Sequence, residues 1–198
     1  MPSHVQHLAR TTRSFRRFRE NFPVTRDLMT QWVDNARVTA SRCNLQPLKY
    51  HLVTDKQECA QVFSTCVWAR YLSDWDGPKE GERPTGYIIL CNDTTLSPSN
   101  LSHFDAGIAA QTIMLASVEE GFGGCMIGSF HAQNIREILN LDKSYVPMLV
   151  VAIGEPQEKI VLEDVEPEES TNYYRDEQDV HYVPKRKLKD IVFTAEKK

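Results

Sequence analysis

The sequence lacks the features that mark membrane, secreted and metal-stapled proteins. It contains no run of about 20 apolar residues, the length that a helix needs to cross a bilayer, so we expect no membrane span. Residues 1–30 hold no apolar run, so we expect no secretory signal. The five cysteines are odd in number and include no CxxC pair, which signals neither a disulfide framework nor a zinc site. These absences together predict reduced thiols and a cytoplasmic protein.

The common catalytic motifs are missing too. The sequence has no GxGxxG after a strand, no GKS or GKT phosphate loop, no GxSxG and no HExxH. The six histidines are scattered and lie in no paired Cys/His pattern, so we predict no metal site. No set of Ser, His and Asp can be assigned from chain order alone. We therefore predict no catalytic side chain.

An excess of positive charge is lacking as well. The chain has 198 residues, a formal net charge of −4 and a pI near 5.9, which argues against a dedicated nucleic-acid binder. Hydrophobic residues make up 41% of the chain and charged residues 25%, as in ordinary globular proteins. The length suits one domain, 1–198, with a buried core.

Against this acidic background, residues 10–19 (RTTRSFRRFR) hold five arginines. Arginine binds phosphate well because its planar fork donates paired hydrogen bonds and keeps its charge. Arg13, Ser14 and Arg16 could therefore hold one phosphate monoester. A second basic cluster, PKRKLK, occupies residues 184–189. Either cluster could instead be a solvated basic surface, and the first could contact nucleic acid or anionic lipid.

Hydrophobic periodicity predicts helices interspersed with strands. The expected helices cover 25–40, 56–72, 103–120 and 132–141, and the expected strands cover 48–54, 87–91 and 148–153. The polar loop 73–86 is a possible lid over a pocket or an ordinary surface loop. The acidic residues 155–182 are expected to form a connector within the domain. This order of elements predicts a mixed α/β or α+β fold in which helices flank a sheet.

Five sequence blocks, in order, resemble the nitroreductase family of FMN-dependent flavoproteins. They are R-S-x-R-x-F at 13–18, S-x-x-N-x-Q-P at 41–47, GFGGCMIG at 121–128, G-x-P at 154–156 and PKRKL at 184–188. The resemblance covers nearly the whole chain. It implies an α+β sandwich, with a central, mainly antiparallel sheet flanked by helices, that forms a homodimer with the flavin at the interface. The missing catalytic side chains agree with this, because a bound cofactor would carry the chemistry.

The resemblance also implies which residues bind FMN. The phosphate-binding block falls on Arg13, Ser14 and Arg16, with a second contribution from near the C-terminus. The loop that meets the flavin ring from the partner subunit falls on 40–44, and backbone amides near flavin N5 fall on 128–129. The implied cofactor-binding residues are Arg13, Ser14, Arg16, Ala40, Ser41, Arg42, Asn44, Gly128, Ser129, Lys185, Arg186 and Lys187.

The implied activity is that of an NAD(P)H oxidoreductase with ping-pong kinetics. NADH or NADPH would pass hydride to flavin N5, and an electron-poor acceptor such as a nitroaromatic or a quinone would then take its place. The same residues would serve a flavin-binding store or sensor without turnover. A small basic-patch module for nucleic acid is a third interpretation, which the acidic pI disfavours.

Overall fold

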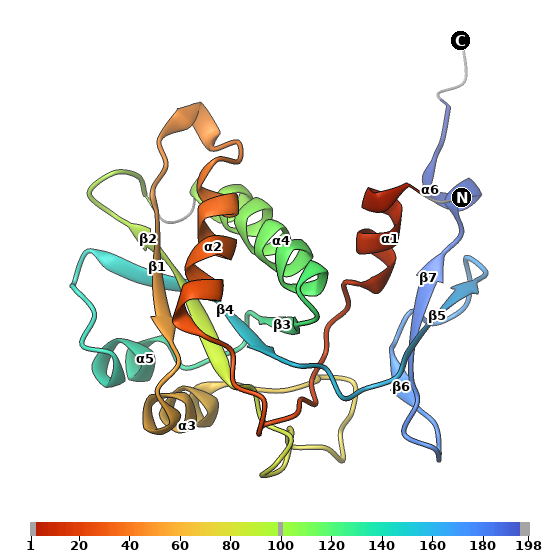
Figure 1. Cartoon of the computed structure of the whole chain (residues 1–198). Coiled ribbons are helices and arrows are strands. Elements are labelled where there is room, and N and C mark those ends of the chain that lie inside the picture. Colours follow the sequence, from red (N-terminus) through yellow and green to blue (C-terminus); the bar gives the residue numbers. More distant parts are fainter. Residues whose placement is uncertain (1–2, 99–100, 195–198) are drawn as a thin grey trace. The chain divides into compact units, whose positions relative to one another are not determined.

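A computed structural model of the chain describes residues 3–98 and 101–194 (Figure 1). The chain divides into two compact units. The first contains Met1–Trp68 and Asp76–Gln157, and the second contains Ala69–Trp75 and Glu158–Lys198. The loop expected at 73–86 is therefore shared between the units, because residues 73–75 belong to the second and residues 76–86 to the first.

A four-stranded sheet forms the centre of the first unit. Its strands are β1 (Leu48–Val53), β2 (Gly86–Asp93), β3 (Gly123–Ile127) and β4 (Tyr145–Gly154), and their order is β1-β2-β4-β3. All three pairings are antiparallel. Every residue of β2 is buried, as expected for a central strand with the apolar run Tyr87–Cys91. Strand β3 lies at an edge of the sheet.

Helices cover both faces of this sheet (Figure 1). Helix α2 (Arg26–Arg37) and helix α4 (His103–Glu119) contribute to the core cluster that contains Ile88 and Leu90 of β2. Because strand side chains alternate, Tyr87, Ile89 and Cys91 point to the opposite face. Helix α3 (Lys56–Thr65) and helix α5 (Ala132–Ile138) pack together and contact the sheet there. Helix α1 (His4–Thr11) contacts α4.

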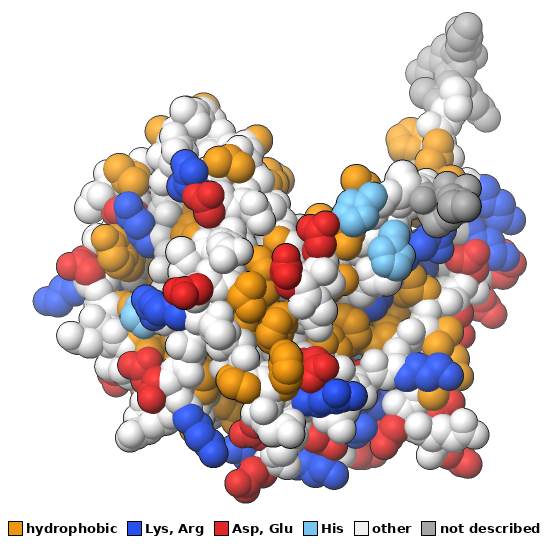
Figure 2. Space-filling view, viewed as in Figure 1, with side chains coloured by type: hydrophobic (Ala, Val, Ile, Leu, Met, Phe, Trp, Pro, Cys, Tyr) orange, Lys and Arg blue, Asp and Glu red, His pale blue; other side chains and the backbone are white. Residues whose placement is uncertain are grey.

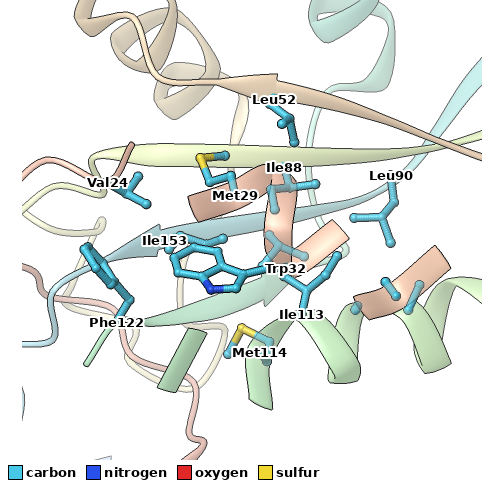
Figure 3. Packing of buried hydrophobic residues seen from close by; sticks show 14 of the residues in the cluster. Val24, Met29, Trp32, Leu52, Ile88, Leu90, Ile113, Met114, Phe122 and Ile153 are labelled. Carbon is cyan, nitrogen blue, oxygen red and sulfur yellow. The ribbon is translucent and has the colours of Figure 1, made fainter. Parts of the chain in front are cut away.

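Trp32 of α2 lies in the middle of the main core cluster, among Met29, Ile113, Met114 and Ile153 (Figure 3). Its ring also contacts the ring of Phe122, with centroids 5.6 Å apart. The small residues in the first half of α4 let α2 approach closely, and they are buried in this cluster: Ala106, Ala109 and Ala110. Burial of large side chains is the main contribution to the stability of this unit.

The second unit contains a three-stranded sheet of order β5-β7-β6. Strand β7 (His181–Arg186) pairs parallel with β5 (Ile160–Val165) and antiparallel with β6 (Tyr174–Arg175). A short helix, α6 (Leu188–Ile191), follows. The acidic segment expected as a connector at 155–182 thus contains two whole strands, β5 and β6, and the first two residues of β7. Its frequent charges hide a strand signal that rests on only a few apolar residues, such as Ile160 and Val161.

The predicted fold class is confirmed, because the first unit is an α+β arrangement around an antiparallel sheet.

The ends of the helices differ from the expectations. The helix expected over 56–72 ends at Thr65, since Cys66 takes an extended conformation and forms a bridge with Phe130. The helix expected over 25–40 ends at Arg37, and a 3-10 turn, η1 (Arg42–Asn44), follows it. None of the helices in the described residues is long and apolar enough to cross a membrane.

Candidate functional site

The arginine-rich segment lies in extended conformation along the edge strand β3. Ser14 forms a parallel bridge with Gly124, and the Phe15 amide donates to the Gly124 carbonyl at 2.9 Å. Glycine is needed here for close approach: a Cβ atom on Gly123 would lie 2.6 Å from the Phe15 ring. The pair Gly123–Gly124, in the GFGGCMIG block, thus fixes the position of the Arg13–Arg16 segment.

Arg13 and Arg16 differ in how their guanidinium groups are used. Arg16 is 8% exposed, and its Nη1 donates to the Ser14 carbonyl at 3.2 Å. Arg13 is half-buried, and its Nη2 donates to the Ala9 carbonyl at 2.5 Å. The Nε of Arg13 is buried with no hydrogen-bond partner among the described residues. Desolvation by burial lowers the Arg13 pKa, but an arginine keeps its charge at neutral pH.

An unpartnered guanidinium N–H beside a free hydroxyl is a suitable donor set for a phosphate. Ser14 is exposed, next in sequence to Arg13. A buried donor without a partner destabilises the free protein. A ligand that accepts a hydrogen bond from this donor removes the penalty, and this contributes to the binding free energy. The Arg13–Arg16 segment therefore fits a phosphate group.

The loop that follows α2 is held by one buried carboxylate. Asp105 of α4 is 4% exposed. It accepts a hydrogen bond from the Ser41 hydroxyl at 2.6 Å and one from the Arg42 amide at 3.0 Å. The Ser41 oxygen in turn accepts from the Gln46 amide at 2.9 Å. These bonds position the segment Ala40–Asn44.

The same loop has an unusual backbone. Three residues without the freedom of glycine have positive φ angles: Cys43 (50°), Asn44 (54°) and Gln46 (50°). Such conformations cost energy and persist where surrounding contacts enforce them. The loop presents Arg42 and Asn44 on the surface, where they are exposed. An asparagine amide there can both donate and accept, as a flavin pyrimidine edge requires.

Gly128 and Ser129 follow directly after β3, and both are exposed. The Ser129 carbonyl accepts from the Val67 amide at 2.8 Å, which ties this turn to the chain after α3. A Cβ atom on Gly128 would meet nothing within 4 Å. The backbone at Gly128 is thus open to a planar group that approaches the end of β3.

The second basic cluster lies in the second unit, at the end of β7. Lys187 pairs with Glu166, and the hydrogen bond that the Lys187 ammonium donates to that carboxylate is the main reason that the Lys187 pKa is raised. Arg186 donates to the Pro167 carbonyl at 2.9 Å. Lys185 is exposed. The prediction that this cluster shares one anion with Arg13 stays a prediction.

Sequence reasoning missed Asp105, which positions the predicted loop. Its signal was present, because it is an acidic residue in the first turn of a helix that is otherwise apolar over most of its circumference. Burial, and next the charge of Asp105, raise the pKa of the nearby Tyr50 to about 12, so this phenol stays protonated.

Among the described residues, no group of three or more His, Cys, Asp or Glu side chains could hold a metal ion.

Charge on the surface is mixed. On the face that Figure 2 shows, Lys and Arg side chains are interspersed with Asp and Glu. A protein that binds nucleic acid through a basic patch gathers positive charge on one face.

Comparison with known proteins supports the resemblance. The model of the nitroreductase family matches residues 86–155, which run from β2 through β4. A Bacillus subtilis (strain 168) protein named "Putative NAD(P)H nitroreductase YodC" is 23% identical over 169 residues, which cover 71% of this chain and 84% of that protein.

Two solved structures share the fold. A nitroreductase family protein from Streptococcus pneumoniae TIGR4 has a TM-score of 0.67 at 18% identity. The structural alignment covers 96% of this chain and 98% of that protein. An FMN-dependent nitroreductase from Clostridium difficile R20291 has a TM-score of 0.61 at 20% identity, with coverages of 77% and 87%. The predicted resemblance to the nitroreductase family and the predicted fold are both confirmed.

Proposed function

We propose that this chain, which has the nitroreductase fold, is an FMN-dependent NAD(P)H oxidoreductase. The observation that carries the proposal is the buried Nε of Arg13, which has no partner among the described residues and lies beside the exposed Ser14. Both residues occupy the segment that pairs with β3. The C. difficile protein that shares this fold is named as FMN-dependent, and FMN carries a phosphate group.

Several groups of this chain would hold the cofactor. Arg13, Ser14 and Arg16 would bind the phosphate. The exposed backbone after β3 at Gly128 and Ser129 receives the ring, and the loop held by Asp105 offers its polar groups to the ring edge of a partner subunit. FMN held there would supply the redox chemistry of an oxidoreductase that uses NADH or NADPH as donor and an electron-poor compound, such as a nitroaromatic or a quinone, as acceptor.

A homodimer would complete this site. Large apolar side chains are exposed at the start of α4 and on the α2–β1 connection, including Phe104 (79% exposed), Val38 (70%), Leu45 and Ile108. Exposed apolar side chains grouped in this way are typical of an interface. The loop 40–44 lies in the same region, so dimerisation would present it to the partner's cofactor.

The test of FMN binding compares two arginines of the same segment. Purified protein is stripped of cofactor and titrated with FMN, and flavin fluorescence reports binding. We expect Arg13→Gln to weaken FMN binding by about tenfold to a hundredfold, because a charge-assisted hydrogen bond contributes roughly 1.5–3 kcal/mol. Arg10→Gln, at an exposed position in α1, should bind FMN as the native chain does.

Two results would overturn the proposal. A native chain that takes up no FMN would exclude the cofactor. Equal FMN affinity in Arg13→Gln and the native chain would show that the unpartnered Arg13 Nε has no part in binding the phosphate.

A further inference from the structure

The first unit contains a cavity that the proposed FMN site does not use. Its volume is about 470 Å³. It lies on the α3 side of the sheet, between α3, the segment that precedes α2 and the loop that leads into β2. The walls combine an apolar part, formed by Ala60, Phe63 and Pro84, with polar groups from Glu20, Arg83 and Tyr87.

Two buried donors in the cavity lining have no hydrogen-bond partner in the part of the chain that the structure describes. The Tyr87 side chain is 0% exposed, and its hydroxyl makes no hydrogen bond among the described residues. The Arg83 Nε is also buried without a partner there. The Arg83 guanidinium lies over the Phe63 ring, 4.5 Å from its centroid, as a cation–π contact. Proteins rarely leave buried donors unsatisfied, so two in one cavity indicate an absent acceptor.

Glu20 and Cys59, two further polar groups in the lining, already have partners. Glu20 accepts from the Gly81 amide at 2.6 Å and from the Arg83 amide at 3.4 Å, so its carboxylate holds the 80–85 loop in place. The Cys59 thiol contacts the carbonyls of Val53 and Thr85. Burial raises the Cys59 pKa to about 12, which excludes it as a nucleophile at neutral pH. Burial also raises the pKa of Tyr87, so its hydroxyl keeps its proton and can donate.

We propose that this cavity binds a small carboxylate with a flat apolar body. The carboxylate accepts hydrogen bonds from the Tyr87 hydroxyl and the Arg83 Nε, and the body packs against Ala60, Phe63 and Pro84. A carboxylate suits these donors because it has two oxygens that only accept, and because arginine pairs well with it. The size agrees with small-molecule sites in general, which are mostly apolar with a few placed polar groups.

This site is separate from the proposed FMN site and does not depend on it. None of the residues assigned to FMN lines the cavity. The purified chain is therefore tested with whatever cofactor it carries, and flavin absorbance is recorded in parallel, so that a probe bound at the flavin is recognised by a spectral change.

The probe is 4-fluorobenzoate, titrated and followed by ¹⁹F NMR. We expect saturable binding to the native chain and at least tenfold weaker binding to Tyr87→Phe, equal to about 1.4 kcal/mol. Tyr87→Phe should unfold at the same temperature as the native chain or higher, because it removes a hydroxyl without a partner. Tyr145→Phe, at the start of β4 and outside the lining, is the matched control and should bind the probe normally.

A second variant tests whether the ligand occupies the cavity, independently of the hydrogen bond from Tyr87. Ala60→Leu, on an exposed position of α3, fills the cavity and should abolish binding while the helix keeps its propensity. The neutral 4-fluorobenzyl alcohol should bind at least tenfold more weakly than the acid. The proposal fails if the native chain does not bind 4-fluorobenzoate, if the alcohol binds as well as the acid, or if Tyr87→Phe and Ala60→Leu both bind it normally.

Discussion

At the scale of single residues, Asp105 holds the loop 40–44 in place. This loop, the ring-binding loop, is the one that we propose to meet the flavin ring of a partner subunit. Its two carboxylate oxygens accept from two donors of that loop, one a side chain and one a backbone amide. A carboxylate buried to this extent is retained only where its hydrogen bonds compensate for lost hydration.

Replacing Asp105 by Asn therefore tests the loop. The amide can accept with one group only, and its NH₂ faces a donor, so we expect a loss of about 1–3 kcal/mol in the free energy of unfolding. FMN affinity should also fall, because the loop loses its position. Urea denaturation and FMN titration measure the two effects. Asp34→Asn, whose carboxylate makes an exposed ion pair with Arg37, should change the unfolding free energy by less than about 1 kcal/mol.

The cysteines provide a second test at this scale. Burial raises the pKa of Cys66 to about 11, and mainly burial raises that of Cys59 and of Cys91 to about 12. Only the thiolate reacts, and below these pKa values the thiols are neutral. At pH 8, iodoacetamide should modify the exposed Cys43 in the native protein and leave the other cysteines unmodified.

Mass spectrometry of the alkylated chain identifies the modified cysteines. In strong denaturant all five cysteines should react, which is the control. If Cys59 of α3 or Cys91 of β2 were alkylated in the native protein as fast as Cys43, the burial of these two thiols would be contradicted.

Residue types predicted part of the site. Arg13, Ser14 and Arg16 could be assigned because their chemistry and spacing fit a phosphate without knowledge of the fold. Asp105 is visible in the sequence only as an acidic residue in an apolar helix. Its partners could not be predicted, since only the tertiary structure brings Ser41 and Arg42 to it across more than sixty residues of sequence. The unpartnered Tyr87 could not either, because a tyrosine at the start of an apolar strand resembles an ordinary core residue.

At the scale of elements, the edge strand β3 orders the arginine segment. Phe15 packs where Gly123 has no side chain, and Gly124 lies against the Ala152 backbone of β4. The double glycine of the GFGGCMIG block permits this close packing.

Gly124→Ala tests this packing. The added Cβ would lie 2.3 Å from the Ala152 carbonyl oxygen, which cannot move aside as a flexible side chain can. We expect a loss of about 1–3 kcal/mol in unfolding free energy, measured on the cofactor-free chain. Gly128→Ala, where the added atom meets nothing within 4 Å, should leave that free energy within about 0.5 kcal/mol of native. An unchanged stability in Gly124→Ala would mean that β3 and β4 do not pack as described.

Most elements of the first unit followed from hydrophobic periodicity, whereas their ends did not. The pattern in 56–72 stays helical past Thr65 because Val67, Trp68 and Leu72 are apolar, but Cys66 pairs with Phe130 instead of continuing the helix. Tertiary pairing of this kind has no local sequence signal. The strands of the second unit were missed for the same reason, since β6 has only two residues and depends on β7.

At the scale of the whole molecule, the exposed apolar side chains near the start of α4 predict a homodimer. Phe104→Asp places a charge in the proposed interface, where burial of an unpaired carboxylate is costly. Analytical ultracentrifugation should show a dimer for the native chain and a monomer for Phe104→Asp. Val5→Asp, at a position of α1 that is 70% exposed, should remain dimeric. A native monomer would leave the ring-binding loop without its proposed role.

The assembly and the activity lie beyond what sequence periodicity predicts. Periodicity identifies which side chains are apolar, and it does not separate those that face a core from those that face a partner. Phe104 and Ile113 both fit one apolar helix, yet one is exposed and the other buried. The flavin function was predicted from the order of five short blocks, none of them specific alone.

The visible spectrum of the purified protein, recorded before and after anaerobic addition of NADH and then NADPH, tests the proposed function most directly. We expect flavin absorption bands that one of the two nucleotides bleaches, and recovery of the bands when a quinone or nitroaromatic is added. Flavin bands that neither nucleotide bleaches would contradict the oxidoreductase proposal and favour a flavin store or sensor. A colourless protein that takes up no added FMN would contradict both.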